Sequence, residues 1–303
     1  MDVITDISNG KNEINECIKR YGSVGEHNFW FFNNQVTSYA KPFFFKFDKD
    51  FGIMSLRYKS GLWEILGEVL APEEKRIELF NQFLEYVLIT RKDKKVFVFP
   101  ADKFTNSIMG MLKHSTKYRL SDSPIVYYTP VFDMRTWDET LQGKKWKKLR
   151  YIKNKLTKSH DIEIVPSEEV DKKKLIDIVF EWKKKRPMGT KAYFIQMYAN
   201  FVKNDFEGTE IARIILVNGE PCSITAGWPV PNSNTTYHSA IGLHNYKCKG
   251  IGELANIDDL NEIKKKRYGY ADFGESAKSL LQFKKKFRPH NIYKSYWFHI
   301  VKK

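Results

Sequence analysis

Residues 247–289 read KCKGIGELANIDDLNEIKKKRYGYADFGESAKSLLQFKKKFRP. A glycine-rich turn opens the segment, and the apolar residues after it recur at helical spacing, which predicts a helix from Glu253 to about Arg267. A short strand, Tyr268 to Phe273, follows and turns at a glycine into a second helix, Ser276 to Phe287. The segment therefore predicts a turn, a helix, a strand and a helix in succession.

Strands are expected on both sides of this segment. Asn218-Gly219 lies between two apolar runs, Glu210 to Val217 and Pro221 to Trp228, and is the strongest hairpin signal in the chain. A third strand is predicted over Thr235 to Leu243 and a last one over Ile292 to Val301. The predicted order is β-β-β-α-β-α-β, which resembles the order of the GNAT acyltransferase fold.

The first half of the chain repeats this succession more loosely. We predict an α/β (α+β) protein of two tandem GNAT-like domains, residues 1–135 and 136–303, with mixed and largely antiparallel sheets. The expected strands of the first half are Phe29 to Phe32, Phe43 to Phe45, Gly52 to Tyr58, Trp63 to Leu70, Val96 to Phe99 and Ile125 to Phe132.

Positive charge is concentrated in the second half. The 303 residues carry 51 Lys and Arg against 36 Asp and Glu. Residues 1–135 have a net charge of +2, and residues 136–303, with 32 basic against 19 acidic residues, have +13. Such a field attracts nucleic acid, anionic lipid head groups or phosphorylated small molecules, so the predicted partners are a polyanion and, as an option, the surface of an anionic membrane.

Composition excludes several classes of protein. With 42% apolar residues the chain can bury one or two cores, which excludes disorder. No apolar run approaches the ~20 residues that span a bilayer, and the first residues lack a signal-peptide pattern, so we expect a soluble, cytoplasmic protein. Cys17, Cys222 and Cys248 form no metal or disulfide pattern, and the seven histidines show no metal-binding spacing, so no metal is predicted.

The turn after the third strand has the form Lys247-x-x-Gly250-x-Gly252. Glycines let backbone N–H groups approach an anion, and the start of a helix adds partial positive charge. In GNAT enzymes the corresponding loop holds the pyrophosphate of coenzyme A. The same pattern is also compatible with an ordinary turn between a strand and a helix.

Several segments together resemble the C-terminal catalytic domain of the phosphatidylglycerol lysyltransferases, a tandem GNAT family related to the Fem-type transferases. Asp272 stands where that family usually has Asn. The segments that carry the resemblance are Lys249–Leu254, Tyr268–Gly274, Ser279–Pro289, Leu149–Lys155 and, in the first half, Trp63–Glu68.

The resemblance implies transfer of an aminoacyl group from a charged tRNA to a hydroxyl or amine of a lipid, peptide or small molecule. No cofactor is implied beyond the aminoacyl-tRNA donor. The implied catalytic residues are Glu253 and Asp272, whose carboxylates would recognise the ammonium of the amino acid, and Lys284, which would face a phosphate or the developing negative charge.

The remaining implied roles are in binding. Lys144 to Lys158 holds eight Lys and Arg and predicts a helix with a cationic face, whose implied tRNA contacts are Lys147, Lys148, Lys153 and Lys155. Arg150 either contacts substrate or braces the linker between the domains. His238 is a candidate general base. The implied substrate-binding residues are Arg150, Lys249, Gly250, Gly252, Lys286 and His238.

Two other functions stay open at this point. The glycine loop is compatible with an N-acyltransferase that uses acyl-coenzyme A, and the basic half with a non-catalytic RNA-binding protein. Each site residue also has a structural alternative. Glu253 could stabilise a helix N-terminus, Asp272 could be a turn residue, and the lysines around Lys284 could be a solvated face.

Overall fold

The computed structural model describes residues 1–48, 50–185 and 192–303. Its strands form one mixed sheet in the order β1-β2-β3-β4-β5-β13-β7-β12-β11-β10-β9-β8, with β6 also paired to β13. The strands are β1 (Asp2–Ile4), β2 (Ala40–Lys46), β3 (Gly52–Tyr58), β4 (Leu62–Ile65), β5 (Lys95–Val98), β6 (Tyr118–Leu120), β7 (Ile125–Asp133), β8 (Ile162–Pro166), β9 (Ile211–Val217), β10 (Glu220–Pro229), β11 (Thr236–His244), β12 (Tyr270–Asp272) and β13 (Asn291–Lys302).

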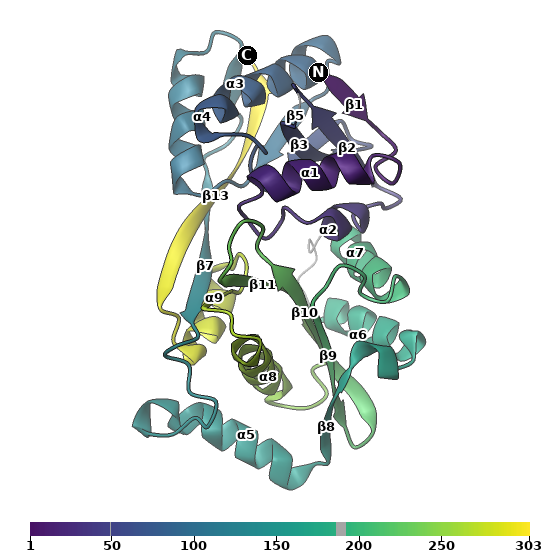
Figure 1. Cartoon of the computed structure of the whole chain (residues 1–303), viewed down its shortest axis with the longest axis vertical. Coiled ribbons are helices and arrows are strands. Elements are labelled where there is room, and N and C mark those ends of the chain that lie inside the picture. Colours follow the sequence, from purple (N-terminus) through teal and green to yellow (C-terminus); the bar gives the residue numbers. More distant parts are fainter. Residues whose placement is uncertain (49, 186–191) are drawn as a thin grey trace.

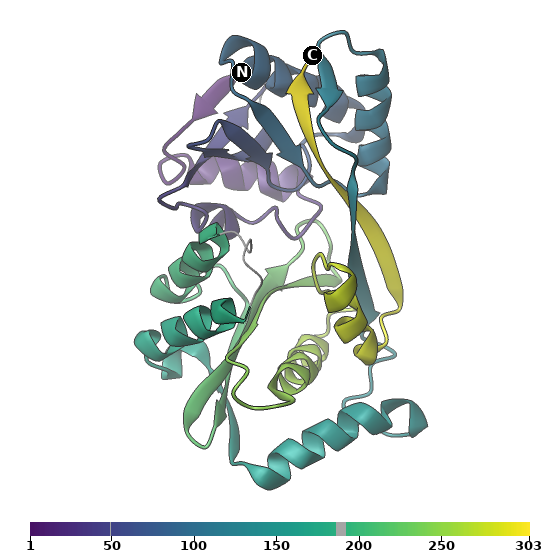
Figure 2. The same cartoon turned by 180° about the vertical axis from the view of Figure 1, so that it is seen from behind.

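Two lobes lie one above the other in Figure 1. The N-lobe contains β1 to β6 with α1 to α4, the C-lobe contains β8 to β12 with α5 to α9, and the long strands β7 and β13 run between them along one side (Figures 1 and 2). The helices are α1 (Lys11–Tyr21), α2 (Phe29–Asn33), α3 (Glu73–Leu84, continued by a π-helical segment, Glu85–Thr90), α4 (Asp102–His114), α5 (Lys147–Ser159), α6 (Lys172–Lys184), α7 (Ala192–Lys203), α8 (Ile251–Lys265) and α9 (Lys278–Lys284).

The predicted hairpin is confirmed. β9 and β10 are antiparallel, and Val217 pairs with Glu220 across the turn. Asn218 and Gly219 both have positive φ, 52° and 76°, as a two-residue hairpin turn of the favoured hand requires. The mixed α/β class is confirmed as well.

Phe29 to Phe32 was expected to be a strand, and that expectation is wrong: these residues form α2. The Asn28 side chain accepts a hydrogen bond from the backbone N–H of Phe31 at 2.9 Å, which is an N-cap. Phe29 and Phe32 are three residues apart, so in a helix both point into the same core beside α1. The cap and this packing outweigh the β propensity of the aromatic run.

Each lobe contains one short parallel strand pair. β4 pairs with β5 from Leu62 to Glu64, and β11 pairs with β12 from Thr236 to His238. Beyond these three-residue pairings the strands separate. The carboxyl ends of both pairs are therefore open edges, where α/β sheets commonly bind ligands.

β13 serves both lobes. Residues 291–297 pair with β7, and Phe298 to Ile300 pair with β5 of the N-lobe. The division of the chain near residue 135 stays a prediction, but the strand that comes last in the sequence lies between strands of the first half.

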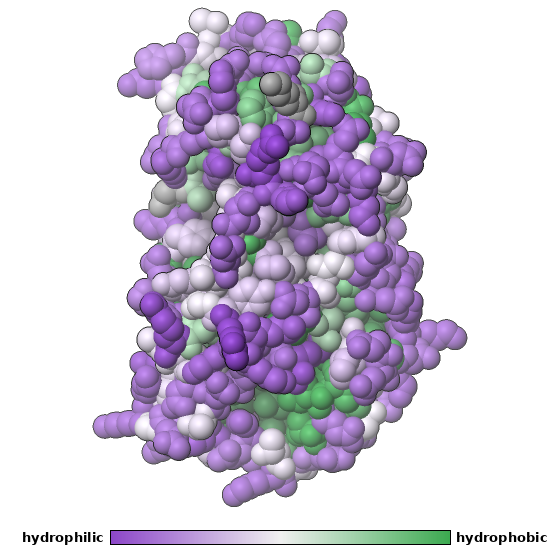
Figure 3. All heavy atoms as spheres, viewed as in Figure 1, coloured by the Kyte–Doolittle hydropathy of each residue, from purple (hydrophilic) through white to green (hydrophobic). Residues whose placement is uncertain are grey.

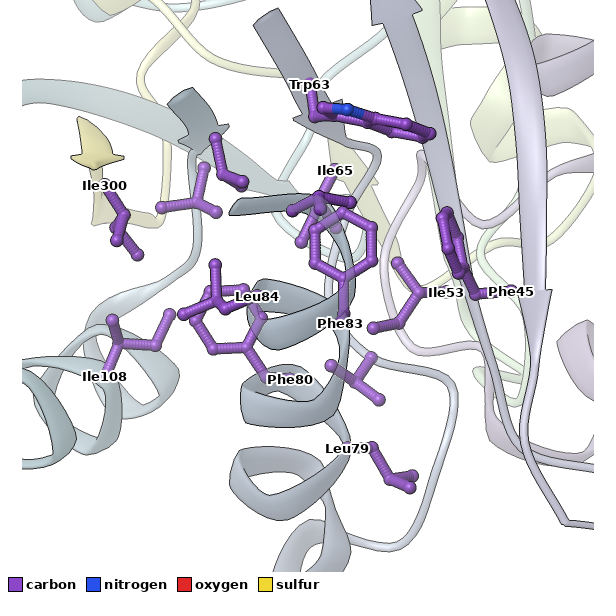
Figure 4. Close-up of a cluster of buried hydrophobic side chains, with 14 of the residues drawn as sticks. Phe45, Ile53, Trp63, Ile65, Leu79, Phe80, Phe83, Leu84, Ile108 and Ile300 are labelled. Atoms are coloured by element: carbon purple, nitrogen blue, oxygen red, sulfur yellow. The ribbon is translucent and has the colours of Figure 1, made fainter. Parts of the chain in front are cut away.

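The cores lie on the faces of the sheet. In the N-lobe, α3 and α4 cover a cluster of buried aromatic and aliphatic residues that includes Phe45, Trp63, Phe83 and Ile300 (Figure 4). Figure 3 shows mainly polar side chains on the face seen in Figure 1, with an apolar area toward the lower end of the molecule. None of the described helices has a stretch long and apolar enough to cross a membrane.

Candidate active site

A small cavity of about 40 Å³ lies where the two parallel pairs separate. Glu68 follows β4, Ala101 follows β5, and Asp272 ends β12, so both lobes contribute to its wall. The volume suffices for a few water-sized groups. The cavity is lined by Val24, Glu26, Gly67, Glu68, Phe99, Pro100, Ala101, Thr129, His238, Asp272, Gly274, Glu275, Tyr293 and Ser295.

Asp272 is held by three neighbours. Its Oδ1 accepts a hydrogen bond from the backbone N–H of Gly274 at 2.7 Å, and its Oδ2 accepts one from the Tyr293 hydroxyl at 2.8 Å. The Nδ1 of His238 lies 3.7 Å from Oδ1. Burial raises the pKa of Asp272, but His238 and these hydrogen bonds outweigh burial, so the pKa lies below its usual value and the carboxylate is ionised.

His238 is 7% exposed, and its Nδ1 has no hydrogen-bond partner among the described residues. Burial lowers the pKa of His238, but the adjacent Asp272 carboxylate and the charge of Glu26 outweigh burial and leave the pKa above 6.5. Thr129 also places an unpartnered buried hydroxyl at this cavity. The wall thus offers polar atoms that the protein itself leaves unsatisfied.

Three further acids line the cavity. Glu68 pairs with Arg76, and burial raises its pKa. Glu275 accepts hydrogen bonds from Ser295 and, at 2.6 Å, from the indole N–H of Trp297. Burial, with a smaller contribution from Glu26, raises the pKa of Glu275 to about 8, so this carboxyl is mostly protonated at neutral pH. Burial also raises the pKa of Glu26.

The structure brings together some of the predicted catalytic residues. Lys284, 9% exposed, donates hydrogen bonds to the backbone oxygens of Phe273 and Gly274, the two residues that follow Asp272. Glu253 instead pairs with Lys286 at 2.7 Å. Neither Glu253 nor Lys284 lines the cavity. Asp272 and His238 do, and Lys284 holds the backbone beside them.

The glycine loop is closely packed. Gly250 is the N-cap of α8 with φ 98°, and a Cβ there would lie 2.7 Å from Ile152 of α5. A Cβ on Gly252 would lie 3.0 Å from the ring of His244. The Cα atoms of both glycines therefore face side chains of the protein. Lys249 stands directly before Gly250 in this loop.

The other predicted binding residues lie on or near α5, at the lower end of Figure 1. Arg150 donates hydrogen bonds to the backbone oxygens of Leu141 and Gly143, which matches the bracing role. The predicted tRNA contacts are surface side chains, of which Lys147, Lys148 and Lys155 are exposed and Lys153 is half-buried.

Four titratable lining residues were missed from the sequence: Glu26, Glu68, Glu275 and Tyr293. Glu275 lies three residues after Asp272, and its position just after the end of a predicted strand could have identified it as a candidate site residue. Glu26 and Glu68 belong to the N-lobe, and only the packing of the lobes brings them to the site. Among the described residues, no group of three or more His, Cys, Asp and Glu is arranged to hold a metal ion.

The family model for the C-terminal domain of phosphatidylglycerol lysyltransferase matches residues 34–299. The chain belongs to this family. No curated protein matches this family member by sequence. Among solved structures, it is similar to L-PGS from Bacillus licheniformis, at 14% identity over 95% of this chain and 90% of the other, with a TM-score of 0.67.

Two further structures have the same architecture. A tandem GNAT protein from the clavulanic acid biosynthesis pathway has a TM-score of 0.59 at 8% identity, over 99% of this chain and 98% of the other. FemX has a TM-score of 0.58 at 9% identity, over 98% and 97%. The predicted tandem GNAT fold is confirmed, and family membership supports a transferase of the aminoacyl-transfer type in general.

Proposed function

We propose that this lysyltransferase-family protein transfers an amino acid from aminoacyl-tRNA to a hydroxyl or amine acceptor, and that the cavity between the lobes holds an ammonium group of the amino acid. One observation carries the proposal: four carboxyl groups and a histidine line a cavity in a chain of net charge +15. An acidic cavity attracts the ammonium group of an amino acid, and the basic excess of residues 136–303 attracts RNA.

His238 and Asp272 are the proposed catalytic pair. The donor ester is already activated, so the protein has to align the two reactants and move one proton. Neutral His238 takes the proton from the attacking hydroxyl or amine and returns it to the leaving oxygen of the tRNA, while Asp272 stabilises the imidazolium between these events. The 3.7 Å separation of this pair is of the kind that shortens when substrate binds.

Lys284 supports the same site indirectly. Its hydrogen bonds to the Phe273 and Gly274 oxygens fix the turn from which the backbone N–H of Gly274 reaches Asp272. We therefore assign Lys284 a positioning role rather than contact with substrate.

An acyl-coenzyme A donor has less support. In the glycine loop that would hold a pyrophosphate, the Cβ positions of Gly250 and Gly252 face Ile152 and His244, so close packing against these side chains accounts for both glycines without a bound anion.

The test uses two labelled donors. Purified protein is incubated with a cell extract and either radiolabelled aminoacyl-tRNA, with and without ribonuclease treatment, or labelled acetyl-coenzyme A. We expect ribonuclease-sensitive label in a new product from the first donor alone, and loss of that product in His238→Asn. Label from the thioester, or salt-sensitive RNA binding without turnover, would refute the proposal.

A further inference from the structure

Residues 22–28, here called the strap, connect α1 to α2 and cross from the N-lobe to the catalytic strands of the C-lobe. The indole N–H of Trp228, on β10, donates a hydrogen bond to the backbone oxygen of Gly25 at 2.7 Å. The Asn232 side chain donates one to the backbone oxygen of Gly22 at 2.8 Å. A Cβ on Gly25 would lie 2.2 Å from Cγ of His238, so the strap backbone lies directly against the catalytic imidazole.

The strap is also fixed to the N-lobe. His27 is fully buried; its Nδ1 accepts a hydrogen bond from the backbone N–H of Ser23 at 3.0 Å, and its Nε2 lies 3.0 Å from the backbone oxygen of Glu68. Burial lowers the pKa of His27 to about 4, so it is neutral at physiological pH and its contacts do not change there. The strap is therefore held from both sides, and Glu26 lies in its middle.

Glu26 differs from the other acids of the cavity. Asp272 has His238 and Tyr293, Glu68 has Arg76, and Glu275 accepts hydrogen bonds while mostly protonated. The Glu26 carboxylate accepts no hydrogen bond from the side chain of another described residue, and it lines the same cavity as His238, whose Nδ1 forms no hydrogen bond within the described residues and lies 3.7 Å from Asp272. The oxygens of this half-buried carboxylate can therefore still accept hydrogen bonds. A ligand that donates hydrogen bonds and carries a positive charge would satisfy them.

We infer that Glu26 binds an ammonium group of the amino acid during transfer. The inference rests on the proposed function and adds to it a residue from outside the family-matched range, residues 34–299. The strap thus supplies, from the first lobe, a recognition group for a reaction centred on Asp272 and His238 of the second.

The test measures binding without requiring turnover. Three probes are titrated calorimetrically into the full-length protein: L-lysine methyl ester, with two ammonium groups; L-norleucine methyl ester, with the α-ammonium alone; and Nα-acetyl-L-lysine methyl ester, with the side-chain ammonium alone. We expect Glu26→Gln to weaken the lysine ester by about tenfold or more, because a charge-assisted hydrogen bond is lost. The single-ammonium probe that is weakened equally identifies the group that Glu26 holds.

Two variants control for folding and for total charge. Glu26→Asp retains the carboxylate and should keep binding within a few-fold of the wild type. Glu16→Gln removes an exposed carboxylate of α1 and should leave binding unchanged. Each variant is compared with the wild type by its thermal unfolding midpoint.

The outcomes separate this inference from the proposed function. The role of Glu26 is refuted if folded Glu26→Gln binds all three probes with unchanged affinity, or if the wild type binds none of them. Either result refutes it even if aminoacyl-tRNA is a donor. Affinity that depends on Glu26 in a protein that transfers nothing from aminoacyl-tRNA supports the ammonium site and refutes the donor.

Discussion

The Asp272 carboxylate connects His238 to the rest of the protein. It contacts His238, Tyr293 and the Gly274 backbone, and the Gly274 turn is in turn held by Lys284. Tyr293 belongs to β13, the strand that both lobes share. The position of one carboxylate therefore depends on the strand end, on α9 and on the central strand.

We predict that Asp272→Asn changes the pH dependence of transfer as well as its rate. Asp272 raises the pKa of His238, so removing its charge should lower that pKa. Transfer requires neutral His238, so kcat/KM of the wild type should rise with pH through the pKa of His238, and the variant should show this rise at lower pH with a smaller maximum. An unchanged midpoint in the variant, measured by pH–rate profiles or by NMR titration of the imidazole, would contradict the assigned pair.

A second prediction concerns Gly25. The methyl group of an alanine there would overlap the His238 ring, and the protein would have to shift to relieve the overlap. Gly25→Ala should therefore lower the free energy of unfolding by about 1–3 kcal/mol. Gly110 lies in α4, and no neighbouring atom lies within 4 Å of the position that a Cβ would occupy there, so Gly110→Ala should instead stabilise by about 0.5–1 kcal/mol. Urea unfolding of both variants measures the contrast, and equal effects would show that Gly25 is not closely packed against His238.

Part of the site could be predicted from the sequence. Asp272 and His238 were candidates because they lie at predicted strands next to a recognisable turn. Features of this kind can be recognised from the local sequence alone. Glu26 could not be found in this way. It is separated from His238 by about two hundred residues, and no local spacing records that the strap crosses between the lobes.

Among the elements, α5 presents the basic surface farthest from the N-lobe (Figure 1). Its apolar residues Leu149 and Leu156 are buried, which turns the lysines outward. The helix is held by packing against α8 at Gly250 and by the contacts of Arg150. A cationic face on a fixed helix is suited to contact with phosphates.

We predict that replacing Lys147, Lys148, Lys153 and Lys155 with alanine weakens tRNA binding and reduces its salt dependence. Each lost phosphate contact should lower the slope of log K against log salt by about 0.7–0.9. A control with the same change in charge replaces four exposed N-lobe lysines, Lys19, Lys41, Lys59 and Lys113. Filter binding at several salt concentrations should show a reduced slope for the α5 variant alone. Equal slopes in the two variants would place the RNA elsewhere.

Elements were predictable where local chemistry and tertiary packing agree. The Asn218-Gly219 hairpin is one such case, because Asn and Gly readily adopt the required positive φ and the Asn218 side chain also accepts a hydrogen bond from the backbone N–H of Asp161 at 2.9 Å. Phe29 to Phe32 is the opposite case. Its aromatic composition favours a strand, but the Asn28 cap and the burial of one helical face stabilise the helix α2 instead.

For the whole molecule, we predict that stability falls as pH rises from about 5 to 8. Burial raises the pKa of Glu275 to about 8 and that of Asp259 to about 7, so between an unfolded pKa near 4 and these values both carboxyls bind a proton in the folded state that they release on unfolding. His27, with a folded pKa of about 4, acts in the opposite direction below pH 6.5, but with one proton against two. The folded pKa of His238 is also raised, so its contribution to the free energy of unfolding likewise decreases as pH rises above 6.5. Glu275→Gln should flatten this dependence in urea titrations, and an unchanged slope would contradict the assignment.

A further prediction concerns the two halves. Residues 1–135 contain β5 and β7 but lack β13, which pairs with both. We expect that neither 1–135 nor 136–303 unfolds cooperatively when produced alone, and that producing them together restores a cooperative transition. Cooperative unfolding of either isolated half, followed by circular dichroism, would show that the halves are independent folding units.

The shared strand also has a consequence for synthesis. Until Asn291–Lys302 has emerged from the ribosome, β5 and β7 lack the neighbour that joins them. The nascent N-lobe therefore keeps an unpaired strand edge exposed from the synthesis of β7, which ends at Asp133, until β13, which begins at Asn291, has been made. We expect chaperones to bind the growing chain throughout this interval and to release it once β13 has paired with both strands.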